Sequence, residues 1–150
     1  MKIVSARRLH LDADRRAVWE TMSRVTEFSN WWPWLRHFDG AELVTGSVWT
    51  CVVQPPLPYS LRFTVALDQV LAPSVVHATV AGDVTGTASV ALQEEGAGCL
   101  AVFNSCLSPH QGVLRMVAAL APPVARYGHD WVLDTGARQF AHLVASSQAG

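Results

Sequence analysis

The spacing of apolar and polar residues in the first part of the chain predicts a strand followed by a helix. Residues 2–11 alternate loosely and contain β-branched side chains, which is typical of a β-strand. Asp12 or Asp14 can then cap a helix that continues to about Ser23. In this segment the apolar residues recur on one helical face, and the charged residues between them face solvent.

A second short helix is followed by a change of period. That helix is expected to begin at Thr26 and to end near Trp32, because Pro33 disfavours helical backbone in the residue before it. From His37 to Leu107 the apolar positions recur with a period of two, and Gly and Pro occupy the interruptions. Six strands are therefore predicted, near residues 37–45, 47–54, 59–71, 74–82, 84–94 and 98–107. Their short connections indicate an antiparallel meander.

The remaining residues, 110–147, are predicted to be helical with an interruption at Pro122-Pro123. The length of the chain favours one α+β domain over residues 1–150. Its seven-stranded antiparallel sheet must curl around the last helix in order to bury an apolar face.

Five short motifs follow one another along the chain: Val18-Trp19, Trp31-Trp32-Pro33, residues 57–63, residues 82–86 and His129-Asp130-Trp131-Val132. In order and spacing they resemble the polyketide cyclase/dehydrase-like branch of the START-like superfamily, also called SRPBCC. The resemblance implies a helix-grip fold, in which a curved sheet holds a long C-terminal helix and two short helices follow the first strand. It also implies a hydrophobic cavity for a polyketide-like, aromatic or lipid molecule. Gly128 departs from the branch, which has an asparagine there.

The composition argues against several classes of function. The 11 basic and 12 acidic residues are mixed along the chain, so no basic block is available for nucleic acid. No apolar run reaches the roughly 18 residues of a membrane helix, and no apolar leader follows the first methionine. Cys51, Cys99 and Cys106 lack metal-binding spacing, which favours free thiols in a cytoplasmic protein. No metal site and no phosphate-binding glycine loop is indicated, so no cofactor is expected.

His129 lies in the middle of an apolar stripe on the last predicted helix. An unpaired polar ring there costs about 1–3 kcal/mol, so it needs a partner or a cavity. Three interpretations stay open: His129 binds a ligand, acts as a general acid or base, or is a core histidine bonded to a strand hydroxyl or carbonyl. Gly136 lies on the same helical face and has no side chain, which is easier to understand if another group fills the space next to it. Asp130 is expected to pair with Arg126, four residues earlier.

Strand parity and aromatic content supply the other candidate contacts. Phe63 and Phe103 are assigned to concave faces, and Ser105 shares the face of Phe103. The tryptophans either form a wall for a flat ligand or are ordinary core packing. The predicted ligand-binding set is Trp31, Trp49, Phe63, Phe103, Ser105, Tyr127, His129, Leu133, Gly136 and Phe140.

Two apolar regions have alternative explanations. Residues 113–125 carry Arg115 as their only charge. Three explanations are open for this segment. It is a lid over the cavity mouth beside the Pro55–Pro58 loop, a plain buried helix or a dimer contact. Outward strand positions are also unusually apolar, at Val48, Val52, Val102 and Cys106, which suggests a homodimer or another partner surface.

Two functions fit these observations. The first is a cofactor-free cyclase or dehydratase that folds a flexible substrate by shape. In it His129 assists proton transfer, and Ser105 or Tyr127 orients a carbonyl. The second is a lipid or metabolite carrier in which His129 only hydrogen-bonds the ligand. No nucleophile constellation is visible, and positioning by shape needs none.

Overall fold

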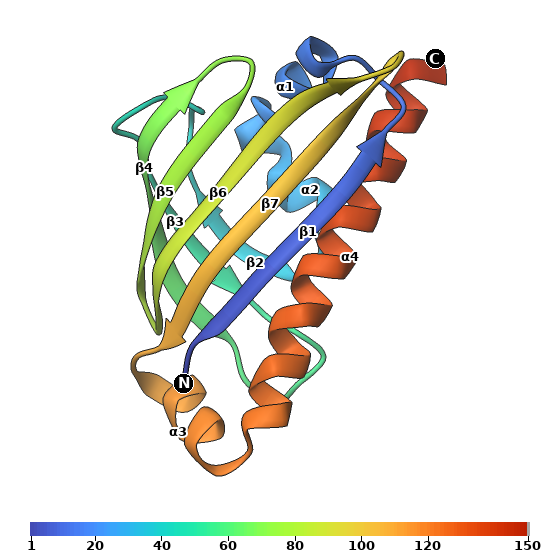
Figure 1. Ribbon diagram of the computed structural model, residues 1–150. Coiled ribbons are helices and arrows are strands. Elements are labelled where there is room, and N and C mark those ends of the chain that lie inside the picture. The colour runs from blue at the N-terminus through green and yellow to red at the C-terminus, as the bar shows by residue number, and fades with distance from the viewer. Residues whose placement is uncertain (150) are drawn as a thin grey trace.

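The computed structural model describes residues 1–149, which form a curled sheet around a long helix (Figure 1). One antiparallel sheet holds the strands in the order β1-β7-β6-β5-β4-β3-β2. The strands are β1 Ile3–Leu11, β2 Leu35–Asp39, β3 Val48–Val53, β4 Leu61–Leu71, β5 Val75–Gly82, β6 Val84–Glu95 and β7 Gly98–Pro109. The helices are α1 Arg15–Met22, the 3-10 helix η1 Val25–Glu27, α2 Phe28–Trp31, α3 Gly112–Leu120 and α4 Pro122–Ala149. The predicted helix-grip fold, with its seven strands and two short helices after β1, is confirmed.

The helix boundaries follow from local chemistry. Of the two predicted caps of α1, Asp14 is the one used, because its side chain accepts a hydrogen bond of 2.8 Å from the Ala17 N–H. Trp32 leaves the second helical segment in an extended conformation, as the following proline requires. The predicted interruption falls between α3 and α4, and Pro122 begins α4. Proline is tolerated there because the first N–H groups of a helix have no internal partner.

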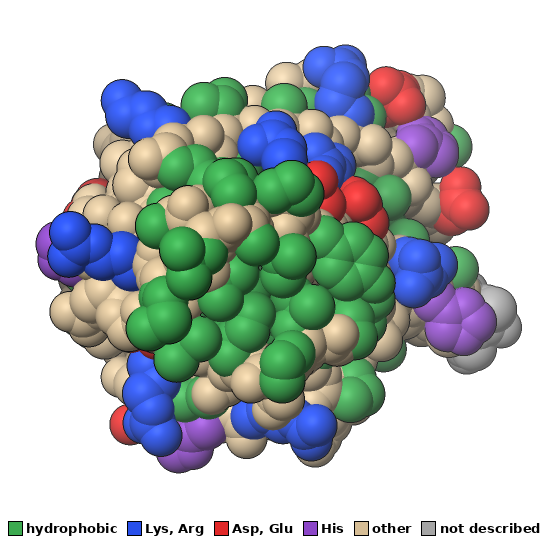
Figure 2. Space-filling model, turned by 90° about the horizontal axis from the view of Figure 1, so that it is seen from below, with side chains coloured by type: hydrophobic (Ala, Val, Ile, Leu, Met, Phe, Trp, Pro, Cys, Tyr) green, Lys and Arg blue, Asp and Glu red, His purple; other side chains and the backbone are tan. Residues whose placement is uncertain are grey.

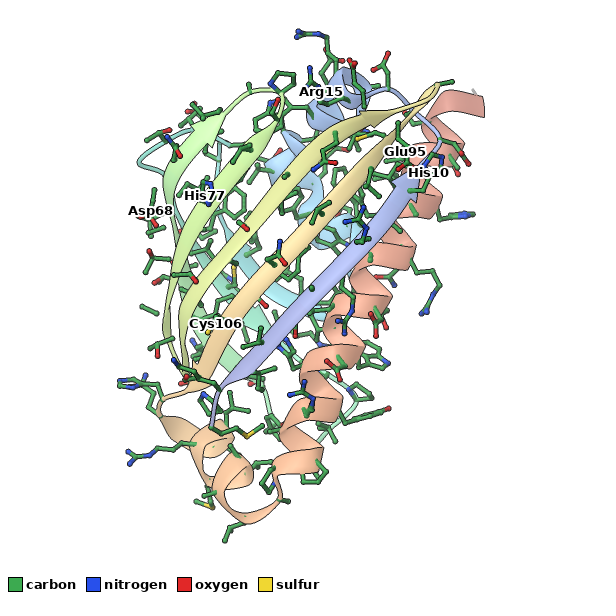
Figure 3. The ribbon with its side chains drawn as sticks, in the orientation of Figure 1. His10, Arg15, Asp68, His77, Glu95 and Cys106 are labelled. Atoms are coloured by element: carbon green, nitrogen blue, oxygen red, sulfur yellow. The ribbon has the colours of Figure 1, made fainter. Side chains whose placement is uncertain are left out.

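The strand register determines which side chains face α4. Phe103 of β7 is opposite Val90 of β6, which is in turn opposite Val76 of β5, a buried core residue. Directly opposite residues share one face of a sheet. Phe63 packs against the same core, so the predicted concave placement of Phe63 and Phe103 is confirmed. His77 is exposed on the other face and is labelled on the outer side of β5 in Figure 3, as the parity also predicts.

The apolar core consists of two clusters, one toward each end of α4. The upper cluster gathers residues of α1, α2, the strands and the C-terminal half of α4, including Val18, Phe28, Cys51, Phe140 and Val144. The lower cluster joins the sheet to α3 and to the start of α4, and its buried members are Tyr59, Val80, Val84, Leu114, Ala118 and Ala125. The region of α4 between the two clusters carries His129.

Candidate functional site

Three polar residues, which we call the interior polar group, meet where β1 and β7 face α4. Ser5 and Ser105 lie directly opposite each other in the two strands, and each is 5% exposed. A hydrogen bond of 2.9 Å joins Ser5 Oγ to His129 Nε2. Ser105 Oγ is buried and has no hydrogen-bond partner within the described part of the chain. Natural proteins rarely leave such a group unpaired, so this hydroxyl needs an explanation.

The environment of His129 keeps its ring neutral at pH 7. Burial lowers the pKa of His129, and the positive charges of Arg7 and Arg126 lower it further. Asp130 and Asp134 act in the opposite direction but do not outweigh burial. A neutral imidazole can both accept and donate a proton. His129 can therefore serve as a base or as a hydrogen-bond partner, and its bond to a strand hydroxyl matches the third interpretation drawn from the sequence.

Arg7 links β1 to the part of α4 that carries His129. Its Nε lies 2.6 Å from an oxygen of Asp134, and its Nη2 lies 3.2 Å from an oxygen of Asp130. The hydrogen bond to Asp134 raises the pKa of Arg7. Asp130 thus pairs with Arg7 across the β1–α4 seam, and the predicted pairing with Arg126 is wrong. Sequence spacing along one helix could not reveal a partner on a distant strand.

Several inward-facing apolar side chains of β4, β6 and β7 are only half-buried. They are Phe63, Val65, Val90 and Phe103, and all of them face the same side of the sheet as the buried core. In a fully packed interior these positions would be covered like Val76 and Leu92. Leu133 on α4 is half-buried as well. The surface that these residues leave uncovered is available to a ligand, and its occupation stays a prediction.

Trp31, Trp49 and Phe140 lie elsewhere, in the upper cluster. Phe28 is at the centre of these rings, with centroids 5.4 Å from Trp31 and 5.6 Å from Trp49. Phe140 packs 6.2 Å from Trp31. These distances are typical of aromatic pairs in a core, so the packing interpretation of the tryptophans is the one that the geometry supports.

Two other predicted ligand contacts are also placed apart from the interior polar group. A Cβ atom on Gly136 would lie 2.9 Å from Cζ2 of Trp34, and the Gly136 carbonyl accepts a bond from Trp32 Nε1. The space at Gly136 is therefore filled by an indole of the protein and not left for a ligand. Tyr127 is 53% exposed at the start of α4.

An open groove of about 520 Å³ lies between residues 33–36, residues 54–58 and Trp131 of α4. Its lining consists of Pro33, Trp34, Arg36, Gln54, Pro55, Pro56, Leu57, Pro58 and Trp131. None of the interior polar group belongs to it. The Pro55–Pro58 loop reaches α4 at Gly128, where an added Cβ atom would lie 3.0 Å from Leu57 Cδ1 and 3.3 Å from Pro55 Cγ. Close packing of this loop gives a physical reason for glycine at this position.

The cysteines are free, as predicted, and burial raises the pKa of Cys51 to about 12, so its thiol is unreactive at neutral pH. The residues described contain no cluster of three potential metal ligands. At the upper end of β1, His10 Nδ1 is 2.7 Å from an oxygen of Glu95 (Figure 3). Within residues 1–149, no helix combines the length and apolar character needed to cross a bilayer.

No protein-family model matches this sequence, and no curated protein matches it significantly. Solved structures do match over nearly the whole chain. The TTHA0849 protein of Thermus thermophilus superposes with a TM-score of 0.75 at 10% identity, covering 98% of this chain and 99% of its own. The Zhui aromatase/cyclase of Streptomyces sp. R1128 gives 0.72 at 17% identity, with 98% and 93% covered. Norcoclaurine synthase of Thalictrum flavum gives 0.62 at 13% identity, with 99% and 97% covered. Likeness at this level of identity shows the fold alone, and it is the helix-grip fold described above.

Among the functional candidates, sequence reasoning missed Ser5 and Arg7. Both occupy inward positions of β1, in the same parity as the buried Ile3 and Leu11. A polar residue on the apolar face of a strand is a detectable signal, because burial of an unpaired polar group is costly. The alternation in residues 2–11 could therefore have identified both positions.

Proposed function

We propose that this protein binds a hydrophobic small molecule that carries a carbonyl or hydroxyl oxygen, in the space between the concave face of the sheet and α4. The observation that supports this most is the buried Ser105 hydroxyl without a partner. A ligand oxygen that hydrogen-bonds to it would remove a cost of about 1–3 kcal/mol. The half-buried Phe63, Val90 and Phe103 offer contacts for an apolar skeleton.

His129 gives this site a route to cofactor-free cyclisation and dehydration of a polyketide-like substrate. With the substrate carbonyl held by Ser105, neutral His129 removes a proton from the adjacent carbon, and the enolate attacks a second carbonyl to form the new carbon–carbon bond. The imidazolium returns the proton to the resulting alkoxide. Loss of water then gives the unsaturated ring. The fold shared with an aromatase/cyclase supports this proposal as an analogy.

The alternative is a carrier without chemistry, and one observation favours it. His129 already has a hydrogen-bond partner in Ser5, and the neighbouring carboxylate of Asp130 is occupied by Arg7. A general base is commonly oriented by a third group. In a carrier, His129 and Ser105 would only bind polar atoms of the cargo.

The location of the site is tested by filling it. Ala88 lies directly opposite Ser105, whereas its neighbour Thr87 points to the outer face and is exposed. We expect Ala88→Phe to abolish binding of an apolar fluorescent probe such as anilinonaphthalene sulfonate and to remove molecules that co-purify in native mass spectrometry. The matched variant Thr87→Phe should retain both. Equal binding by the two variants would place the ligand outside the sheet interior.

The choice between enzyme and carrier is tested with His129→Phe, using the co-purifying molecule or its precursor as ligand. An enzyme with this substitution binds the molecule but loses turnover by about 100-fold or more, the usual contribution of a general acid or base. A carrier retains binding, only slightly weakened. Unchanged binding together with unchanged turnover would remove His129 from the site altogether.

A further inference from the structure

A continuous apolar surface covers the lower end of the molecule, and we call it the basal face. It consists of Val113, Met116 and Leu120 of α3 with Val124 and Tyr127 of α4, which are 38–80% exposed. Figure 2 shows this end as a broad hydrophobic area. Large exposed apolar surfaces of this kind commonly mark a contact with another molecule.

The helix α3 is apolar on both of its sides. Leu114 and Ala118 point into the lower cluster and are buried, which leaves the side with Met116 and Leu120 uncovered. Of the explanations considered from the sequence, a plain buried helix is therefore wrong. Asp83 holds the start of α3 in place, because its backbone carbonyl accepts bonds from the N–H groups of His110 and Gln111. The uncovered side is thus presented outward by a fixed attachment.

Basic residues outnumber acidic ones around the basal face, where Asp83 lies against the start of α3 and Asp130 follows Tyr127 by three residues. All 12 acidic residues lie outside residues 96–129, whereas Arg115 and Arg126 lie within this segment and are exposed. The N-terminus, with exposed Lys2, is at the same end of the molecule (Figure 1). In Figure 2 Lys and Arg side chains lie on several sides of the hydrophobic area, and acidic side chains adjoin it on one side. A symmetric dimer through this face would bring its basic rims together, which is unfavourable. An anionic lipid surface would attract them.

We propose that the basal face docks onto the surface of an anionic membrane, with α3 and the first turns of α4 lying among the lipid headgroups. Apolar side chains surrounded by basic ones are the features of helices that lie in this interface. In this orientation α3 separates the bilayer from the lower cluster. Docking itself requires neither a bound ligand nor catalysis, so it can be tested independently of the function proposed above.

The test measures binding of the full chain to phosphatidylcholine vesicles with and without phosphatidylserine as about a third of the lipid. We expect binding that needs phosphatidylserine and weakens as salt is raised. Met116→Glu and Leu120→Glu should each reduce it about tenfold or more, because a charge replaces an inserted apolar side chain. The control Val48→Glu changes a residue that is 60% exposed on β3 and should bind normally. Arg115→Gln and Arg126→Gln should each weaken binding to the phosphatidylserine vesicles about fivefold and leave binding to phosphatidylcholine vesicles unchanged.

Three results would overturn the proposal. They are absence of binding to the phosphatidylserine vesicles, equal binding by Leu120→Glu and Val48→Glu, and a dimer in light scattering that Leu120→Glu converts to a monomer. The last result would assign the basal face to a contact between two copies of this chain. Because Leu120 is 80% exposed, its substitution should leave thermal unfolding unchanged, and loss of binding can then be attributed to the surface.

Discussion

The two halves of α4 lie against two different kinds of interior. Around Phe140 the rings of the upper cluster are in contact, and the indole N–H groups of Trp32, Trp34 and Trp49 all have acceptors. Around His129 the apolar side chains are half-covered, and the Ser105 hydroxyl has no partner among the residues that the structure describes. The half of α4 around Phe140 therefore lies against a closely packed core. The half around His129 lies against a less completely packed interior, which is where the proposed ligand would bind.

The largest effect should come from the centre of the packed half. Phe28 is 8% exposed and contacts Trp31, Trp32, Phe38 and Trp49. We expect Phe28→Ala to lower the free energy of unfolding by about 3–5 kcal/mol, because it leaves a cavity among rings. Urea unfolding followed by tryptophan fluorescence measures this loss.

Phe103→Ala is the matched control from the other half, since Phe103 is half-buried and faces the predicted ligand space. Phe103→Ala should lower the free energy of unfolding by less than about 2 kcal/mol, because less buried apolar surface is lost from the core. Equal losses for the two phenylalanines would mean that the interior around His129 is packed as tightly as the upper cluster, and the comparison would fail.

The sequence predicted the fold well, but it did not predict that one half of α4 lies against a packed core and the other half against a less packed interior. Periodicity and proline positions identified the strands and helices, because both depend on residues close together in the chain. Helical spacing also placed His129 on the face of α4 that meets the sheet, where its ring is bonded to Ser5. The same spacing placed Gly136 and Phe140 on the ligand side, however, since a helical wheel shows only which residues share a face. Whether Trp34 or a ligand fills the volume at Gly136 depends on a contact across the fold.

The interior polar group shows the same limit. Ser105 was found by parity along its own strand, but its neighbour Ser5 comes from a strand 100 residues away. The opposite placement of the two serines depends on the pairing of β1 with β7, which local patterns do not determine. The Arg7 pairing with Asp130 and Asp134 was missed for the same reason.

Ser5 and Ser105 provide a second test, with a smaller effect, inside the less packed half. Ser5→Ala removes the partner of His129 Nε2 and should lower the free energy of unfolding by about 1–2 kcal/mol. Ser105→Ala removes a hydroxyl that has no partner within residues 1–149, so the free energy of unfolding should stay unchanged or rise by up to about 1 kcal/mol. Ligand binding should nevertheless weaken in Ser105→Ala. Thermal and urea unfolding of the two variants, whose residues are equally buried, would measure the difference. A clear loss of stability in Ser105→Ala would show that its hydroxyl has a partner, such as a buried water.

The smallest effect is a dependence of stability on pH that should belong to the less packed half alone. Burial holds the pKa of His129 below the value of about 6.5 that it has in the unfolded chain, so the unfolded protein binds more protons at mildly acidic pH. Stability should therefore be highest above this value and fall as the pH drops through it. In His129→Gln that part of the pH dependence should disappear, whereas other groups titrate equally in both proteins and cancel in the difference.

The rings of the upper cluster do not ionise, so Phe28→Ala should lower stability by the same amount at about pH 7.5 and about pH 5. Parallel stability curves for the wild type and His129→Gln would mean that the ring is as accessible to water as in the unfolded chain. Convergence of the two curves at acidic pH would instead locate the titration at His129 and support an interior that excludes water around a neutral imidazole.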